Sequence, residues 1–157
     1  MNVNNNIFSK ILVPVDGSVN SMKAIDYAVD LTEKYKSELI ALHVLYSQTG
    51  FAFHKETVAG TITSSSLNDL NLEAKQEAEK WFDEINKRAE KKNVQIKTEV
   101  VFTVISIVEG ILTYAEKENI DLIVIGSKGK SGWKKLIVGS VASGISTYAH
   151  CPILIVK

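Results

Sequence analysis

The chain has 157 residues, of which 45% are hydrophobic and 23% are charged, and its formal net charge at pH 7 is zero. These totals are typical of a globular domain and argue against binding of nucleic acid or a membrane surface through bulk positive charge. No apolar run is long enough to span a bilayer, residues 1–6 carry no signal peptide, and Cys151 has no second cysteine to pair with. We therefore expect a single cytoplasmic domain over 1–157, with a disordered N-terminus at 1–6.

Two near-continuous apolar runs, Ile11–Val15 and Leu39–Leu45, have the pattern of strands that are buried on both faces of a parallel sheet. Pro14 cannot donate a ladder hydrogen bond, so we expect it at the end of the first strand. The turn residues Asp16–Ser18 follow, with Ser18 as a helix N-cap. An amphipathic helix is predicted between the two strands, because apolar residues recur there at helical spacing: Ala24, Ile25, Ala28, Leu31 and Tyr35.

The middle of the chain is less regular. Tyr46–Ser66 mixes glycines, phenylalanines and a Thr/Ser run, and we expect a long loop there, with room for a short helix. A long helix is predicted over Leu67–Lys92 and ends at Asn93. Its apolar stripe consists of Leu70, Ala74, Ala78, Trp81, Phe82, Ile85 and Ala89. Val94–Phe102 is predicted to be an edge strand.

The C-terminal part predicts two more helices and two more strands. Ser106 and Glu109 have capping-box spacing for a helix through Lys117, in which Gly110 is a weak point. The expected inward residues are Ile107, Ile111, Leu112 and Ala115 in this helix, and Val141, Ile145 and Tyr148 in a last helix over Ser140–His150. The strands are expected at Asp121–Ile125 and Pro152–Val156.

Strands and helices alternate throughout, which predicts an α/β fold with a doubly wound, five-stranded parallel sheet and right-handed crossovers. In such sheets ligands bind beyond the carboxyl ends of the strands, where the strand order reverses. Asp16 follows the first strand, and a glycine-rich loop follows the fourth. If those two strands are neighbours, Asp16 and the loop share one crevice.

The glycine-rich loop begins where the apolar run stops at Gly126, and it continues to Gly139-Ser140 at the start of the last helix. Glycines let backbone N–H groups approach an anion, and a helix N-terminus adds partial positive charge, so the stretch is a candidate phosphate cradle. The alternative is a connector that only needs turns. Gly129-Lys130-Ser131 resembles the end of a Walker A loop, but that motif also requires a glycine at Val124, inside the strand.

Four stretches of the sequence carry a resemblance to a known family: Lys10–Ser18, Leu42–Val44, Gly126–Ser140 and His150–Val156. They are similar to the universal stress protein family, and the likeness spans nearly the whole chain. Lys10–Ser18 resembles the opening strand and turn of the family, and Leu42–Val44 resembles the end of its second strand. Gly126-x-x-Gly129, followed after nine residues by Gly139-Ser140, resembles the family's ATP-binding signature. His150–Val156 resembles its last turn and strand. One departure is Thr103–Ser106, where the family usually has a polar turn with glycine or proline.

The resemblance implies a Rossmann-like fold of the adenine-nucleotide alpha-hydrolase type that binds ATP, with Mg²⁺ carried by the phosphates. It places Pro14, Val15 and Asp16 at the adenosine and Val44 at the base. The residues it places at the ribose and phosphates are Ile125, Gly126, Gly129, Gly139, Ser140 and Val141. Ser127, between these glycines, is included in the expected site, and Lys128 and Lys130 are phosphate candidates by their nearness to the glycines. Residues 46–66 form the variable part of the family.

The expected function is that of an ATP-binding switch or interaction module in the stress response, acting on an unknown protein partner. One alternative is a slow ATPase or phosphotransferase, although no base is evident beside the lysines. Another is a nucleotide-free structural subunit in which the glycines are only turns. The three histidines are scattered, so no protein metal site is expected. In the expected strand order 3-2-1-4-5, the apolar edge strand 153–156 predicts a homodimer.

Overall fold

The computed structural model describes residues 6–46, 64–130 and 138–157. The elements in chain order are β1 (Lys10–Pro14), α1 (Val19–Tyr35), β2 (Glu38–Tyr46), α3 (Ser64–Glu90), β3 (Ile96–Thr103), α4 (Ile107–Lys117), β4 (Leu122–Gly126), α5 (Ser140–Tyr148) and β5 (Ile153–Val156). Strands and helices therefore alternate as the periodicity predicts. Within the described ranges, none of the helices has both the length and the hydropathy needed to span a membrane.

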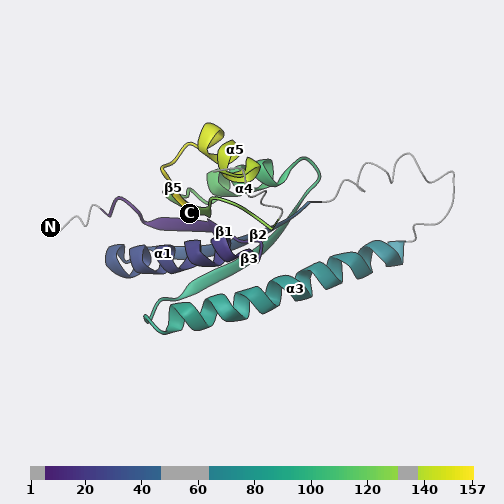
Figure 1. Cartoon of the computed structure of the whole chain (residues 1–157), viewed down its shortest axis with the longest axis horizontal. Coiled ribbons are helices and arrows are strands. Elements are labelled where there is room, and N and C mark those ends of the chain that lie inside the picture. The colour runs from purple at the N-terminus through teal and green to yellow at the C-terminus, as the bar shows by residue number, and fades with distance from the viewer. Residues whose placement is uncertain (1–5, 47–63, 131–137) are drawn as a thin grey trace.

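The sheet has five strands in the order β3-β2-β1-β4-β5, and every neighbouring pair is parallel. This confirms the predicted fold class and strand order. Figure 1 shows α4 and α5 on one face of the sheet and α1 and α3 on the other. The strand order reverses between β1 and β4, which are neighbours, so the carboxyl ends of these two strands meet at one edge of the sheet.

Two buried apolar layers hold the helices to the sheet. Alternate residues of β1 face opposite sides: Ile11 and Val13 pack with α1 and α3, whereas Leu12 packs with α4 and α5. Because both faces are covered, the central strands are almost entirely apolar and fully buried. The near-continuous hydrophobic runs in the sequence have this physical origin.

The helix ends agree with the sequence signals. Ser18 caps α1 by accepting a hydrogen bond from the N–H of Ser21, and Ser106 caps α4 by accepting one from Glu109. The Glu109 carboxylate accepts from the hydroxyls of Thr103 and Thr113, so it ties α4 to the end of β3. Asn93, which follows α3, has a left-handed backbone with φ of 54°, as expected of a residue that ends a helix.

Two predicted inward-facing residues are exposed, and this part of the helix assignment was wrong. Ile107 is 39% exposed and Tyr148 is 67% exposed. The next residue in the chain, Val108 or Ala149, packs inward instead, and the other five predicted residues do face the sheet. The residues that pack against the sheet side are Val108, Ile111, Leu112 and Ala115 in α4, and Val141, Ala142 and Ile145 in α5, with Ala149 just beyond it. The α4 set follows the i, i+3, i+4, i+7 spacing of an amphipathic helix, and the α5 set lies on one face because its members are three, four, seven or eight positions apart or adjacent.

The boundaries of the predicted loop also differ at its two ends. Tyr46 belongs to β2, and Ser64–Ser66 form the start of α3. The remainder of that prediction, residues 47–63, lies outside the described residues, as does most of the predicted disordered N-terminus. Hydrogen bonding to β3 explains the extra length of β2, since Tyr46 pairs with Thr103.

Close packing of α4 on the sheet explains why a glycine occupies position 110 despite its low helix propensity. A Cβ atom at this position would lie 2.8 Å from Cγ1 of Val44 and 3.2 Å from Cγ2 of Thr103. Glycine therefore lets α4 lie close to β2 and β3. The packing gain outweighs the roughly 1 kcal/mol that glycine costs in a helix interior.

Candidate functional site

Asp16 lies at the meeting point of β1 and β4. Its Oδ1 accepts a hydrogen bond from the backbone N–H of Ser18 at 3.0 Å, and its Oδ2 accepts one from the backbone N–H of Lys130 at 2.9 Å. The first bond forms the turn into α1. The second joins this turn to the loop after β4, although the two residues are 114 positions apart. The structure therefore brings Asp16 and the glycine loop together.

The Asp16 carboxylate is held in its ionised form. Partial burial raises its pKa, but hydrogen bonds from Ser18, Lys130 and Ser21 outweigh burial, and the pKa lies below its ordinary value of 3.8. A depressed pKa contributes stability that is present above the unfolded-state value and is lost as the pH falls through the folded-state value. The ionised carboxylate therefore stabilises the turn at neutral pH.

We expect Asp16→Asn to destabilise the protein at pH 7. The asparagine side chain has one oxygen and one NH2 group, and the NH2 group cannot accept the hydrogen bond that a carboxylate oxygen accepts from Ser18 or Lys130. The difference from the wild type should shrink as the pH falls below 3.8, where the wild-type carboxylate also becomes protonated. Urea unfolding of both proteins at pH 7 and at pH 3 measures this. Asp83→Asn, on the exposed side of α3, is the matched control and should cost little at pH 7. A difference that stays constant with pH would contradict the assignment.

The three glycines of the proposed signature lie against different parts of the molecule. A Cβ at Gly126 would lie 2.6 Å from the backbone carbon of Asn20 in α1. A Cβ at Gly129 would lie 2.6 Å from Oδ2 of Asp16, and one at Gly139 would lie 3.2 Å from the carbonyl oxygen of Ser127. Each glycine permits a close approach between segments that are distant in the chain. Spacing in the sequence does not distinguish these roles.

Ser127 connects the two halves of the loop. Its carbonyl accepts from the N–H of Gly139 at 2.6 Å, and its own N–H donates to the carbonyl of Val156 at 2.7 Å. The residue is 2% exposed, and its hydroxyl accepts from Nδ2 of Asn20 at 3.2 Å. Its side chain is thus engaged inside the protein. We infer that Ser127 supports the loop, whereas Ser140 is exposed at the loop's other end.

The N-terminus of α5 is the feature best suited to hold an anion. Gly139 is its N-cap and makes no side-chain capping hydrogen bond. The first N–H groups of this nine-residue helix are therefore not satisfied by a capping side chain. Because Gly139 is bonded to Ser127, this helix start lies beside the end of β4. N–H groups and the helix dipole together favour a phosphate at such a position.

The apolar residues of the predicted site divide between the two faces of the sheet. Val44, Ile125 and Val141 belong to the same cluster, on the side of α4 and α5. Val15 is 4% exposed and packs into the opposite cluster with α1 and α3. Pro14 is the buried last residue of β1 and pairs with Leu42, so Val44 extends two residues beyond it at the edge where Asp16 lies. The side chains of Val15 and Val44 therefore lie on opposite faces of the sheet.

Three side chains near Asp16 were not predicted to belong to the site. His43 Nδ1 lies 2.7 Å from the carbonyl oxygen of Val15, and the His43 ring meets Trp81 edge-on at 5.1 Å between centroids. Glu77, one turn before Trp81 in α3, accepts a hydrogen bond from Nζ of Lys130 at 2.8 Å. The sequence placed Trp81 in an apolar stripe. A histidine inside an apolar strand was the available signal for a polar contact there.

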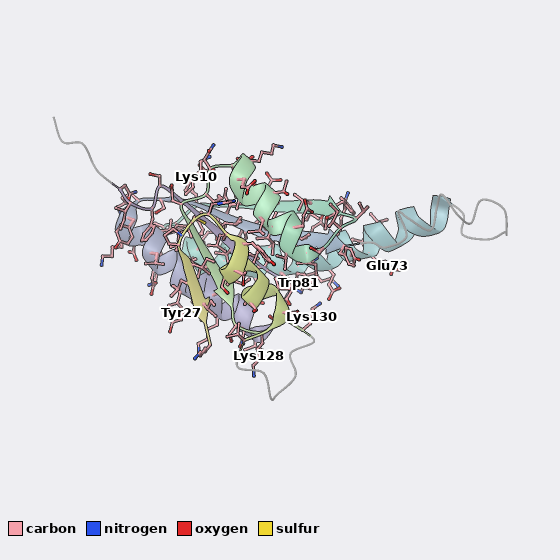
Figure 2. The ribbon with its side chains drawn as sticks, turned by 90° about the horizontal axis from the view of Figure 1, so that it is seen from above. Lys10, Tyr27, Glu73, Trp81, Lys128 and Lys130 are labelled. Carbon is pink, nitrogen blue, oxygen red and sulfur yellow. The ribbon has the colours of Figure 1, made fainter. Side chains whose placement is uncertain are left out.

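The two candidate lysines have different surroundings. Lys130 reaches α3, and Figure 2 shows it beside Trp81, with its Nζ 4.2 Å from the centroid of the indole ring. Lys128 contributes its carbonyl oxygen, which accepts from the hydroxyl of Ser18 at 3.4 Å. The main chain of Lys128 therefore joins the loop to the turn after β1. The ammonium group of Lys130, in contrast, donates a hydrogen bond to a side chain of α3.

A groove of about 670 Å³ lies at the other end of the strands from Asp16, beside the amino ends of β2 and β3. Its lining residues are Thr32, Glu33, Lys36, Ser37, Glu38, Leu39, Lys92, Asn93, Val94, Gln95, Ile96 and Lys97. Several of these charges are paired with one another or with neighbours, as Lys92 is with Glu33 and Lys97 with Glu99. In parallel α/β sheets ligands bind at the carboxyl edge, so this groove is not part of the candidate site.

Residues 8–157 match the universal stress protein family. Universal stress protein MJ0531 of Methanocaldococcus jannaschii is 32% identical over 152 residues, which cover 97% of this chain and 84% of the relative. Universal stress protein YxiE of Bacillus subtilis is 33% identical, and the match covers 96% of this chain and 100% of the relative. The similarity therefore spans all nine helices and strands of the described residues.

Solved structures show the same architecture. The structure of protein MJ0577 has a TM-score of 0.76 at 26% identity and covers 96% of both chains. Two structures below 25% identity share the fold: a universal stress protein in complex with cAMP, with a TM-score of 0.62, and one from Archaeoglobus fulgidus in complex with dAMP, with a TM-score of 0.64. Each of these two proteins therefore binds an adenine nucleotide.

Proposed function

Because the chain belongs to the universal stress protein family, we propose that it binds ATP in the crevice between Asp16 and the glycine loop and acts as a nucleotide-dependent switch. The observation that carries the proposal is the hydrogen bond from Lys130 N–H to Asp16 Oδ2. It joins the carboxyl ends of β1 and β4 at the reversal of strand order, where ligands bind in such sheets. The cAMP and dAMP complexes of relatives support an adenine nucleotide.

The charges determine how the nucleotide lies in this site. An ionised carboxylate repels phosphate, so Asp16 faces the ribose hydroxyls or the base, both of which can donate hydrogen bonds to it. The phosphates lie at the other end, where the first N–H groups of α5 and the exposed Ser140 supply donors. Val44 and Ile125, in the cluster beside α4, provide apolar contact for the base.

ATP fits the donor set of the phosphate end. The α5 N-terminus has no side-chain cap, and Gly129 is exposed next to Asp16, where a Cβ would lie 2.6 Å from Oδ2 of the carboxylate. When bound, ATP supplies a polyphosphate whose oxygens accept hydrogen bonds from these N–H groups, and Mg²⁺ reaches the site with those phosphates. The residues of this chain bind and orient the nucleotide: Ser140 and Val141 hold the phosphates, and Asp16 holds the sugar.

Mass spectrometry of small molecules released from freshly purified protein tests the proposal directly. We expect an adenine nucleotide in near-equal amount to the protein, or saturable binding of added ATP by calorimetry. Adenosine should bind more weakly than ATP, since it lacks the phosphates that α5 would hold. Protein that retains no nucleotide and binds neither ligand would support the alternative in which the glycines serve only as turns.

The switch is proposed to act on a protein partner in the cytoplasm through a change at the loop after β4. ATP would add contacts at Gly126–Lys130 and at Gly139, which are joined through Ser127. Backbone amides in both segments should then exchange more slowly in hydrogen-exchange experiments with saturating ATP. Unchanged exchange in both segments would rule out the switch while leaving nucleotide binding intact.

We also propose a homodimer through residues 153–156. β5 is an edge strand of the sheet, and three of its four residues, Ile153, Leu154 and Ile155, are only partly buried. An apolar edge of this kind is usually covered. Sedimentation velocity over a dilution series should show a dimer, and a monomer throughout the series would contradict the proposal.

A further inference from the structure

Lys130 links the glycine loop to helix α3. Its backbone N–H donates to Asp16, while its Nζ donates to Oε1 of Glu77 at 2.8 Å. The same ammonium group lies over the ring of Trp81, 4.2 Å from the centroid, within the range of a cation–π interaction. Two side chains of α3, Glu77 and Trp81, therefore hold the ammonium group of Lys130 in this structure.

Helix α3 also contacts the turn that carries Asp16. A Cβ at Gly17, which has φ of +75°, would lie 2.3 Å from Cε2 of Trp81, so the indole packs directly on this turn. His43 meets the same indole and lies 2.7 Å from the carbonyl oxygen of Val15. Trp81 and Glu77 are one helical turn apart on the same face. Through them, α3 contacts both halves of the proposed nucleotide site.

Glu77 is an exposed carboxylate that competes with any other anion for Lys130. The hydrogen bond from Lys130 lowers the pKa of Glu77, which therefore remains ionised at neutral pH. A lysine has a flexible stem and a point charge, so it can leave one carboxylate for a group of higher negative charge. A triphosphate carries such a charge, whereas adenosine carries none. Separating Lys130 from Glu77 costs free energy, and this cost lowers the affinity only for ligands that carry phosphate.

From these contacts we propose that Glu77 is a specificity-determining residue of the nucleotide site: it holds Lys130 against Trp81 until the phosphates of a bound nucleotide take that lysine over. The inference rests on the proposed function. Lys130 contacts the phosphates, whereas Glu77 acts through Lys130 and touches no ligand. Glu77 thereby sets how much more tightly ATP binds than adenosine does.

Calorimetric titration of ATP and of adenosine into the wild type and three variants tests this inference. Glu77→Gln should tighten ATP binding about two- to fivefold, the range expected for an exposed ion pair, and leave adenosine binding unchanged. Lys130→Met should weaken ATP binding and remove the effect of Glu77→Gln in the double variant. Glu73→Gln makes the same charge change one turn earlier in α3, farther from Lys130 in Figure 2, and should change neither affinity.

A second measurement follows Lys130 itself. The chain has two tryptophans, Trp81 and Trp133, so Trp133→Phe leaves Trp81 as the only one. ATP should change the emission of Trp81 as the ammonium leaves its ring, and this change should be smaller when Lys130 is also replaced by methionine. An identical change in both proteins would overturn the inference.

The outcomes separate this inference from the proposed function. If the wild type binds ATP but Glu77→Gln leaves its affinity unchanged, the role of Glu77 is wrong and the nucleotide site stands. Tightening that is equal in Glu73→Gln, or that persists with Lys130→Met, would show a general charge effect and would also overturn the role of Glu77. If the wild type binds neither ATP nor adenosine, both proposals fail.

Discussion

Replacing Gly126 with alanine is expected to destabilise the fold by about 3 kcal/mol, the upper end of the usual cost of overpacking. The new Cβ would lie 2.6 Å from the carbonyl carbon of Asn20, 2.8 Å from its oxygen and 2.8 Å from the nitrogen of Ser21. All three are backbone atoms in the first turn of α1, which Ser18 caps, so they cannot rotate away as a side chain would. Urea unfolding of the two proteins measures the loss.

Gly144→Ala is the matched control for this substitution. Its new Cβ would lie 2.9 Å from Cγ2 of Val108, a side-chain atom, and alanine gains up to about 1 kcal/mol over glycine in a helix interior. We therefore expect a much smaller change in the free energy of unfolding than for Gly126→Ala. Equal losses for the two variants would show that contact with the α1 backbone is not the reason for glycine at position 126.

Gly129→Val is expected to have a different profile, with ATP binding weakened about 100-fold and a loss of stability of about 1.5 kcal/mol, the lower end for one hydrogen bond to a charged group and smaller than the loss for Gly126→Ala. Gly129 is exposed, so a larger side chain costs little in packing there. Its Cβ would lie 2.6 Å from Oδ2 of Asp16, which forces the carboxylate away from the N–H of Lys130. We expect the displaced carboxylate to lose its hydrogen bonds to the nucleotide as well. Hydrogen bonds to a charged group contribute about 1.5–3 kcal/mol each, so losing one or two of these accounts for the expected change in affinity.

Calorimetry with ATP, together with urea unfolding of the same sample, checks both parts of this expectation. Wild-type affinity in Gly129→Val would show that the crevice beside Asp16 does not hold the nucleotide. A large loss of stability would instead assign Gly129 to the same structural role as Gly126. The two glycines are equivalent in the sequence signature, and the comparison of the two variants separates their roles.

The main features of the fold could be predicted because they depend on local patterns. The apolar runs at β1, β2 and β4 mark strands that are covered on both faces, and the structure buries them completely or nearly so. Capping residues such as Ser18 and Ser106 act within one turn of a helix, so their role is visible in the sequence. The exposure of Ile107 and Tyr148 could not be predicted, because these residues fit the helical period as well as their inward-facing neighbours Val108 and Ala149 do.

The candidate site could be predicted in part. The rule that ligands bind at the carboxyl ends of parallel strands selected Asp16 and the glycine loop, and the structure joins them through Lys130. The involvement of α3 could not be predicted, since Glu77 and Trp81 fit the pattern of an ordinary amphipathic helix equally well. Whether Lys128 or Lys130 directs its ammonium group toward α3 also depends on the path of the loop.

By itself, the sequence determined the order of helices and strands, the parallel sheet and the two chain segments of the candidate site, because hydrophobic period and turn chemistry act over a few residues. Only the tertiary structure decided what each glycine contacts, that Ser127 is engaged inside the protein, and that Glu77 holds Lys130. The physical reason is that these are contacts between residues tens of positions apart. Their geometry is set by how the helices pack on the sheet, and no local pattern encodes it.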